Sequence, residues 1–189
     1  MAFKEYLSLI EGLIKVQDDF IKNTTDYSRN VRIDITNEKI ECRKLAQEVI
    51  DSLRFLPRAS SITFYVLVDS DFVITSDKLR LRIVLNNLVS NAIKYSDSLK
   101  KVIFIEIGAS QQNDGITLYV KDNGIGIATE WLPKIFDMFL RATEHSSGSG
   151  LGLFITKESI EKMRGTISAE SKSGEGSTFS IHLPSSAIG

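Results

Sequence analysis

The first thirty residues carry hydrophobic side chains at a helical spacing. Aromatic or leucine side chains recur every seven residues, and further apolar residues occupy neighbouring positions of the same face. This pattern predicts one long amphipathic helix, whose apolar face packs either on its own domain or on a partner helix of a dimeric bundle. The recurring residues are Tyr6, Leu13, Phe20 and Tyr27, flanked by Leu9, Ile10, Val16 and Ile21.

The rest of the chain alternates between strand-like and helix-like patterns. Apolar residues at every second position of residues 31–35 predict a strand, after which Thr36 or Asn37 can cap a helix of about residues 38–55. The later elements follow from the same periodicities and from the turn residues between them. They are a hairpin of residues 62–68 and 72–75, a helix from an N-cap at Ser76 to Tyr95, strands 102–107 and 116–120, a helix of residues 151–163, and a final hairpin of residues 166–171 and 178–183.

This order of elements predicts the fold class. Helices alternate with hairpins, which favours a two-layer α/β sandwich with a mixed, mostly antiparallel sheet, preceded by the long N-terminal helix. The pattern does not predict a doubly wound parallel sheet.

Composition narrows the range of functions. The chain has 189 residues with 23 basic and 24 acidic side chains, and this balance argues against nucleic-acid binding through bulk electrostatics. One cysteine, Cys42, excludes a disulfide framework, and the two histidines, His145 and His182, leave little material for histidine-based metal or triad chemistry. The sequence shows no apolar run of about 20 residues and no signal-peptide pattern, so we expect a cytoplasmic location.

Four polar residues follow one edge of the helix predicted to end at Tyr95. Asn87, Asn91, Lys94 and Tyr95 lie beside its apolar stripe at positions i, i+4, i+7 and i+8. Amide oxygens suit Mg²⁺ and an ammonium group suits phosphate. Taken alone, this pattern is more typical of a solvated helix edge.

Two glycine-rich segments strengthen the case for a ligand site. Residues 122–127, Asp-Asn-Gly-Ile-Gly-Ile, directly follow a predicted strand, and residues 148–153, Gly-Ser-Gly-Leu-Gly-Leu, open the helix that ends near Met163. Glycines allow close backbone approach to a ligand, and the N-terminus of a helix attracts phosphate. Between the two segments lie Phe136, Phe139 and Arg141, of which the phenylalanines could anchor a mobile lid or simply belong to the core.

Taken in order, these segments resemble the catalytic ATP-binding domain of sensor histidine kinases. Residues 87–95, 122–127, 136–141 and 148–153 are similar to the N, G1, F and G2 boxes of that family, and residues 174–179 are similar to its last glycine turn. The resemblance covers about residues 31–183. It implies the Bergerat-type α/β sandwich, with ATP and Mg²⁺ as cofactors, in a catalytic domain of residues 31–189.

The resemblance also implies a role for each matching residue. Asn91 would bind Mg²⁺ between the ATP phosphates, with Asn87 as a second ligand or a phosphate contact, and Lys94 and Arg141 would compensate phosphate charge. Asp122 would accept the adenine amino hydrogen bond, with Thr178 nearby. The remaining residues implied to line the nucleotide site are Tyr95, Gly124, Gly126, Ile127, Gly148, Gly150, Leu151, Gly152 and Leu153, and about residues 128–147 would form the ATP lid.

One position separates a kinase from a hydrolase. Related chaperone and gyrase-type ATPases carry a water-activating glutamate where this chain has Asn87, and an amide cannot act as a general base. The sequence therefore favours a domain that holds ATP until another nucleophile arrives.

The phosphoacceptor histidine of such kinases is not recognisable here. Neither His145, in the predicted lid, nor His182, in the last predicted strand, has an acceptor-like context. Residues 1–30 resemble the second helix of the family's dimeric phosphoacceptor hairpin. We therefore expect a catalytic fragment that phosphorylates an acceptor helix of the same receptor and does not phosphorylate itself. The full-length protein is expected to be a homodimer and to pass the phosphoryl group to a response regulator receiver domain. The alternative is a nucleotide-responsive interaction module without phosphotransfer.

Overall fold

The structure is a computed structural model, and it describes residues 6–7, 10, 13–14, 17–18, 20–21, 23–25, 27–28, 32–140 and 149–184. Seven strands are defined in this part of the chain: β1 (Glu38–Glu41), β2 (Thr63–Leu67), β3 (Val73–Ser76), β4 (Phe104–Gln112), β5 (Gly115–Asp122), β6 (Thr166–Lys172) and β7 (Gly176–Pro184). The helices are α2 (Cys42–Leu53), α3 (Lys78–Lys94) and α4 (Gly152–Lys162), with 3-10 turns at Ala59–Ser61 and Leu132–Lys134.

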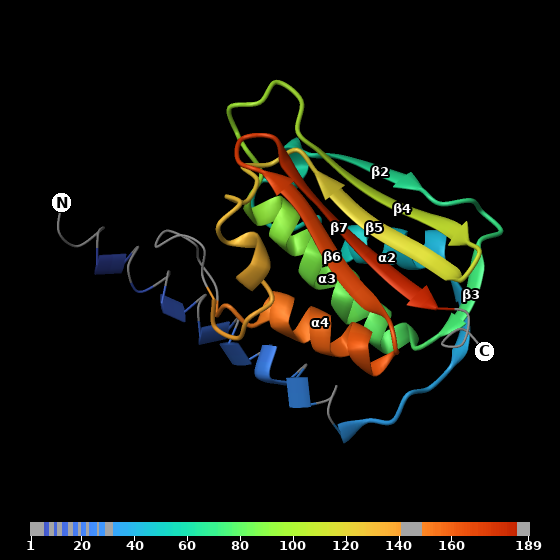
Figure 1. Cartoon of the computed structure of the whole chain (residues 1–189). Coiled ribbons are helices and arrows are strands. Elements are labelled where there is room, and N and C mark those ends of the chain that lie inside the picture. The colour runs from blue at the N-terminus through green and yellow to red at the C-terminus, as the bar shows by residue number, and fades with distance from the viewer. Residues whose placement is uncertain are drawn as a thin grey trace.

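The main sheet has five strands in the order β2-β4-β5-β7-β6. Strands β2 and β4 are parallel, and every other neighbouring pair in this sheet is antiparallel. A separate two-stranded sheet pairs β1 with β3. Helices α2, α3 and α4 lie together on one face of the main sheet, so the domain has two layers (Figure 1). The predicted α/β sandwich with a mostly antiparallel sheet is confirmed.

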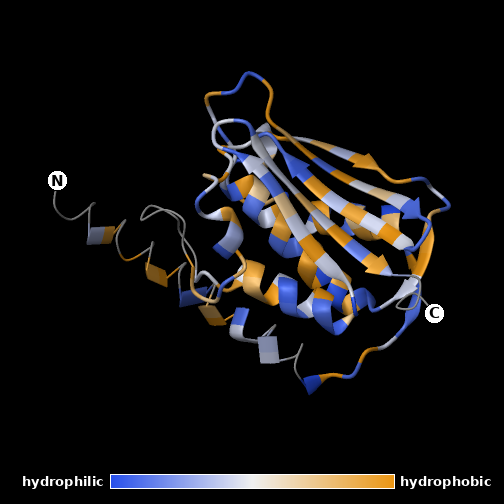
Figure 2. Ribbon diagram, viewed as in Figure 1, coloured by the Kyte–Doolittle hydropathy of each residue, from blue (hydrophilic) through white to orange (hydrophobic). Residues whose placement is uncertain are grey.

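The core lies between these two layers. Hydrophobic and hydrophilic residues alternate along the strands (Figure 2), and in β7 the buried residues recur at every second position. Ile105, Ile107, Val120 and Ile181 are each at most 1% exposed and belong to one cluster with the inner faces of α2 and α3. This arrangement is the expected result of burying one face of a sheet while the other faces solvent.

Of the two predicted hairpins, one is confirmed and one is wrong. Strands β6 and β7 form the predicted antiparallel hairpin, and the predicted strands 102–107 and 116–120 also pair antiparallel, as β4 and β5, with β4 extending to Gln112. Strands β2 and β3, in contrast, do not pair with each other, because β2 pairs with β4 and β3 with β1. The prediction missed this because both partners lie far away in the sequence.

The start of the domain also differs from its prediction. Ile33 and Ile35 lie outside any strand and are each 42% exposed, and the strand forms instead at β1. Consequently α2 begins at Cys42, preceded by Glu41, and neither Thr36 nor Asn37 caps it. Alternation over three apolar positions was too short a signal to locate the strand.

The N-terminus of α3 is held by a buried ion pair. Its N-cap is Asp77, which accepts a hydrogen bond from the backbone N–H of Arg80, whereas the predicted cap, Ser76, ends β3 and donates to Met163 Sδ. The Arg80 guanidinium pairs with the Asp77 carboxylate, and Arg80 as a whole is 1% exposed. Asp77 therefore serves both as helix cap and as counter-ion.

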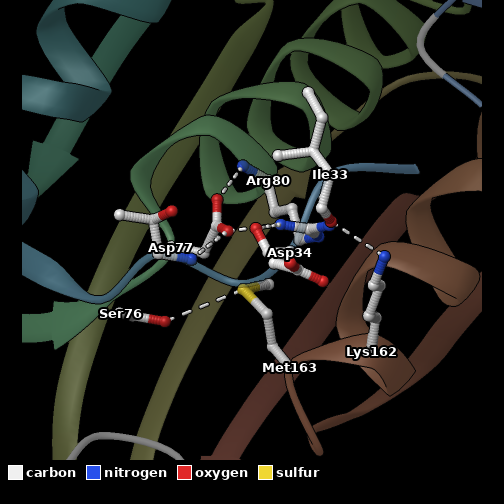
Figure 3. Close-up of polar contacts among 8 residues, drawn as sticks. Ile33, Asp34, Ser76, Asp77, Arg80, Lys162 and Met163 are labelled. Atoms are coloured by element: carbon white, nitrogen blue, oxygen red, sulfur yellow. Dashed lines mark hydrogen bonds and ion pairs between the residues drawn. The ribbon is translucent and has the colours of Figure 1, made fainter. Parts of the chain in front are cut away.

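The same cluster fixes the segment that enters the domain. Arg80 donates to the carbonyl oxygens of Ile33 and Asp34, Lys162 of α4 donates to the Ile33 carbonyl at 3.0 Å, and Thr36 N–H donates to Asp77. Figure 3 shows these groups converging on the chain at residues 33 and 34. The entry segment is thus anchored to both α3 and α4.

The N-terminal segment agrees with its predicted helical state at every described residue from Tyr6 to Ser28. Its C-terminal part contacts the domain: the rings of Tyr27 and Phe154 lie 6.0 Å apart, and Asn23 Nδ2 donates to Ser149 Oγ at 2.8 Å. Large apolar side chains earlier in the segment are exposed, namely Tyr6, Leu7, Ile10, Leu13, Ile14, Phe20 and Ile21. No helix among the described residues combines the length and the apolar character needed to cross a membrane.

Cys42 gives a direct test of core integrity. Burial raises the pKa of its thiol to about 11, and the residue is 3% exposed. Because the thiolate is the reactive form, we expect iodoacetamide at pH 8 to alkylate the native protein at least about 100-fold more slowly than the unfolded chain. Mass spectrometry with and without guanidinium measures both rates. Similar rates would show that the start of α2 opens readily.

Candidate functional site

The C-terminal half of α3 presents the four predicted polar residues. Asn87 is 9% exposed, and its Nδ2 donates to the Gly152 carbonyl oxygen at 3.2 Å. Asn91, Lys94 and Tyr95 are half-buried, and Lys94 Nζ lies 4.9 Å from the centre of the Tyr95 ring. A simple solvated edge does not describe Asn87, because this side chain is buried and joins α3 to the first residue of α4.

Asp122 lies at the end of β5, where the first glycine-rich loop begins. Its Oδ1 accepts a hydrogen bond from Gly124 N–H at 2.7 Å. Burial raises the pKa of the Asp122 carboxyl above its ordinary value, and the N–H groups of Gly124 and Ser177 and the charge of Lys100 partly oppose this rise. The loop therefore holds a largely desolvated carboxyl group that forms no ion pair with another described residue, a group suited to accept hydrogen bonds from a ligand.

The glycines of this loop are required by the protein itself. A Cβ at Gly124 would collide with the carbonyl oxygen of Tyr95, and Ile125 N–H donates to that same oxygen at 3.0 Å. Gly126 has a positive φ of 67°, and a Cβ there would collide with the carbonyl oxygen of Lys172. The loop is consequently packed between the end of α3 and the turn after β6, which keeps Asp122 close to Tyr95.

Strand β7 contributes a residue that the sequence analysis missed. Asp122 is the cross-strand partner of Ser177, so the two side chains share one face of the sheet. Thr178, the predicted site residue, is next in the strand and points to the opposite face. Ser177 also lies 2.9 Å from Ser171 through their hydroxyl oxygens. Because Ser177 and Thr178 are adjacent and both carry a hydroxyl group, the sequence did not indicate which of the two faces the core.

The beginning of α4 forms the opposite side of the site. Gly150 has a positive φ of 70°, and Phe139 N–H donates to its carbonyl oxygen at 3.0 Å, which brings residues 139 and 150 together. Gly152 is in van der Waals contact range of Asn87, since a Cβ there would lie 3.8 Å from the Asn87 amide. Leu151 is 4% exposed and packs with Ile155, so its side chain belongs to the core in this structure.

The predicted lid, residues 128–147, has two parts. Its first part is docked on the domain: Ile135 is 6% exposed, and the Phe136 ring meets the Phe179 ring edge-on with centroids 6.4 Å apart. Phe139, in contrast, is 56% exposed and has a φ of 64°. Residues 141–147 lie outside the described residues, as do the predicted site residues Arg141 and Gly148.

The remaining predicted residues lie close to these groups. Ile127 N–H donates to Ser171 Oγ at 2.8 Å, and its side chain packs against the main core, as does that of Leu153. Most predicted site residues therefore converge between α3, the start of α4 and the ends of β5 and β7. The exceptions among the described residues are Thr178, on the other face, and Leu151, in the core, while Arg141 and Gly148 are not among the described residues.

A second missed residue is Lys100, in the connection from α3 to β4. Its Nζ donates to the Asn123 carbonyl oxygen at 2.6 Å and to the Gly174 carbonyl oxygen at 2.8 Å, linking the first glycine-rich loop to the β6–β7 turn. A lysine in a polar loop carries no recognisable signal, because the carbonyl groups that it contacts come from positions 23 to 75 residues away.

Comparison with known proteins agrees with this architecture. The family model of the histidine kinase-, DNA gyrase B- and HSP90-like ATPases matches residues 76–187, more than half of the chain, and the chain belongs to that family. Among curated proteins it is 33% identical over 171 residues to sensor histidine kinase AtsR of Burkholderia thailandensis and 30% identical over 178 residues to sensor histidine kinase WalK of Bacillus subtilis. These alignments cover 87% and 92% of the chain but only 28% and 29% of those proteins.

Solved structures show the same fold. The catalytic domain of histidine kinase ThkA superposes with a TM-score of 0.67 at 27% identity, covering 79% of this chain and 97% of that one. Full-length ShkA, solved in complex with AMPPNP, superposes with a TM-score of 0.77 at 24% identity, covering 96% of this chain and 38% of that one. The resemblance to histidine kinase catalytic domains seen in the sequence is therefore confirmed.

Proposed function

We propose that this chain is the catalytic, ATP-binding part of a sensor histidine kinase, which binds Mg-ATP and transfers the γ-phosphoryl group to a histidine of a separate helix. The observation that carries the proposal is the junction between Asn87 and Gly152, which places the amide-bearing face of α3 against the glycine-rich start of α4. At the C-terminal end of α3, two turns beyond Asn87, the loop of Asp122 packs against Tyr95. The Asn87–Gly152 junction thus suits the phosphates of a nucleotide, and Asp122 suits its adenine base.

The chemistry of the donors fits a magnesium ion. The amide nitrogen of Asn87 is committed to Gly152, which leaves the amide oxygen as the atom that can act as a ligand. Asn91 follows one turn later on the same helix face. Neutral oxygens together with phosphate oxygens and water suit Mg²⁺, which would neutralise charge on the transferred phosphoryl group.

The protein's own contribution is positioning. Asp122 would accept a hydrogen bond from the adenine amino group with Ser177 beside it, Lys94 would face the phosphates, and Asn87 offers no general base to activate water. Transfer then breaks the bond from the γ-phosphorus to the leaving oxygen of ADP and forms a phosphorus–nitrogen bond to the acceptor imidazole. We further propose a cytoplasmic site of action, a homodimeric full-length receptor and a response regulator as the next phosphoryl acceptor.

A phosphotransfer assay tests this function. The full chain is mixed with ATP labelled at the γ-phosphate and with a synthetic peptide of the histidine-bearing helix from a sensor kinase relative. We expect acid-labile label on the peptide, at least about tenfold less label when EDTA removes Mg²⁺, and no label on the chain alone.

Other outcomes contradict the proposal in distinguishable ways. Saturable ATP binding with no labelled peptide supports a nucleotide-responsive module without phosphotransfer. Phosphate release without any acceptor would indicate an ATPase of the gyrase type. A robust labelled band on the chain alone would show that His145 or His182 is itself an acceptor.

A further inference from the structure

The four carbonyl groups around Lys100 form a cage made by two separate loops. Its Nζ lies 2.6 Å from the Asn123 oxygen and 3.3 Å from the Gly124 oxygen, in the loop after β5. It lies 2.8 Å from the Gly174 oxygen and 3.4 Å from the Glu175 oxygen, in the β6–β7 turn. An ammonium group can direct its three hydrogens into such a set of acceptors as a compact charge.

These two loops meet mainly through their backbones. Gly174 N–H donates to the Ile125 carbonyl oxygen at 2.7 Å, and a Cβ at Gly176 would collide with the Asp122 carbonyl oxygen. Four further carbonyl oxygens, two from each loop, converge on Lys100 Nζ at this junction. Without a cation between them, these carbonyl dipoles would repel and the junction would widen.

The cage includes the backbone that orients Asp122. Asp122 Oδ1 accepts a hydrogen bond from Gly124 N–H, and Lys100 donates to the carbonyl oxygen of that same Asn123–Gly124 peptide group and to that of the next peptide group, Gly124–Ile125. The Asn123 side chain fixes the same loop to Phe104 and Val102 from the other side. Lys100 and the Asn123 side chain thus both hold the loop of Asp122, the residue expected to bind adenine, and Lys100 is the cationic one of the two.

We propose that Lys100 is a positioning residue for nucleotide selectivity: it holds the first glycine-rich loop against the β6–β7 turn, so that Asp122 is presented to the base. This inference rests on the proposed function, because Asp122 is the adenine-recognising group only if the chain binds ATP. Guanine carries a carbonyl where adenine carries its amino group, so a correctly held Asp122 carboxylate favours ATP and repels GTP.

The test measures ATP and GTP binding by calorimetry in the full chain carrying Lys100→Met, which keeps an unbranched side chain one heavy atom shorter and removes its charge. We expect ATP affinity to fall about tenfold with much less change for GTP, so that the preference for ATP narrows. Lys101→Met is the matched control, since it removes the same charge from the next, exposed residue. It should leave both affinities within about twofold.

A purely structural role predicts a different result, namely equal losses for ATP and GTP together with a lower thermal midpoint. That result, or unchanged ATP binding in Lys100→Met, would overturn the role of Lys100 and leave the proposed function intact. Failure of the wild-type chain to bind ATP would overturn both.

A second measurement covers the case in which Lys100→Met does not fold. Hydrogen exchange of the wild-type chain should show ATP slowing the amides of residues 124–127 and 174–176 together, because the cage makes the two loops one unit. Slowing confined to the first loop would contradict the proposal.

Discussion

Replacing Arg80 with methionine is expected to destabilise the domain by about 3–5 kcal/mol, because it leaves the Asp77 carboxylate buried without its counter-ion. Arg80 is 1% and Asp77 3% exposed, so water cannot take over the role of the guanidinium. The substitution also removes the donors to the Ile33 and Asp34 carbonyl oxygens. Chemical denaturation measures the change in the free energy of unfolding.

A nearby arginine supplies the control for this experiment. Arg82 lies on the same helix and pairs with Glu48, but both side chains are about one-third exposed. Exposed pairs contribute little, so Arg82→Met should cost less than about 1 kcal/mol. Equal losses in the two variants would show that burial of the Asp77–Arg80 pair is not what stabilises this part of the fold.

The Arg80 variant should also loosen the entry segment selectively. Residues 33–36 are held by Arg80, Asp77 and Lys162, which join α3 and α4 to the chain arriving from the N-terminal helix (Figure 3). Under conditions where the variant remains folded, limited proteolysis is expected to cut this segment faster than in the wild type. Unchanged cleavage would mean that Lys162 and the β1–β3 pairing are sufficient to hold it.

Asp122→Asn is expected to lower ATP affinity by about 100-fold or more, because the side-chain amide can present a donor where the adenine amino group needs an acceptor. The stability of the domain should change little. The raised pKa of Asp122 means that its ionised form is less favoured in the folded protein than in water, and asparagine keeps an oxygen that can accept from Gly124 N–H.

Binding and unfolding therefore need to be measured on the same sample. Calorimetry with Mg-ATP gives the affinity, and thermal unfolding without nucleotide gives the midpoint. Thr178→Val is the matched comparison, since its side chain lies on the other face of the sheet, and we expect little effect on affinity. Saturable ATP binding that survives Asp122→Asn would count strongly against the proposed function.

Local elements were the most predictable part of the fold. The β4–β5 and β6–β7 hairpins join strands that are adjacent in sequence, and their turns contain Asn113-Asp114 and the glycines at 174 and 176. Turn chemistry and alternation act over short distances, so the sequence displays both. Helix α4 was predictable for the same reason, because it ends before Gly165.

Strand pairing between distant segments was not predictable. Residues 62–68 and 72–75 have the pattern of a hairpin, yet β2 joins β4 and β3 joins β1. A β pattern shows that a segment needs a partner but not which partner it has. The choice depends on how α2 and α3 cover the sheet, which is a property of the assembled core.

The candidate site also has residues that short sequence segments predict and residues that depend on distant parts of the chain. The order of the motifs identified Asn87, Asn91 and Asp122 as candidates, since residue type and spacing on one element suffice for that inference. Ser177 and Lys100 became visible only in the folded chain. The first depends on which face of β7 turns inward, and the second on carbonyl groups brought from two loops.

By itself the sequence determined the fold class, the family resemblance and the elements that carry the nucleotide-binding motifs, because helical and strand periodicity and motif order are properties of short segments. The tertiary structure decided the pairing of β2 and β3, the buried Asp77–Arg80 anchor of the entry segment, which of Ser177 and Thr178 shares a face with Asp122, and the carbonyl cage of Lys100. Each of these depends on groups far apart in the chain that meet in a water-poor environment, where a charge or dipole must find a partner.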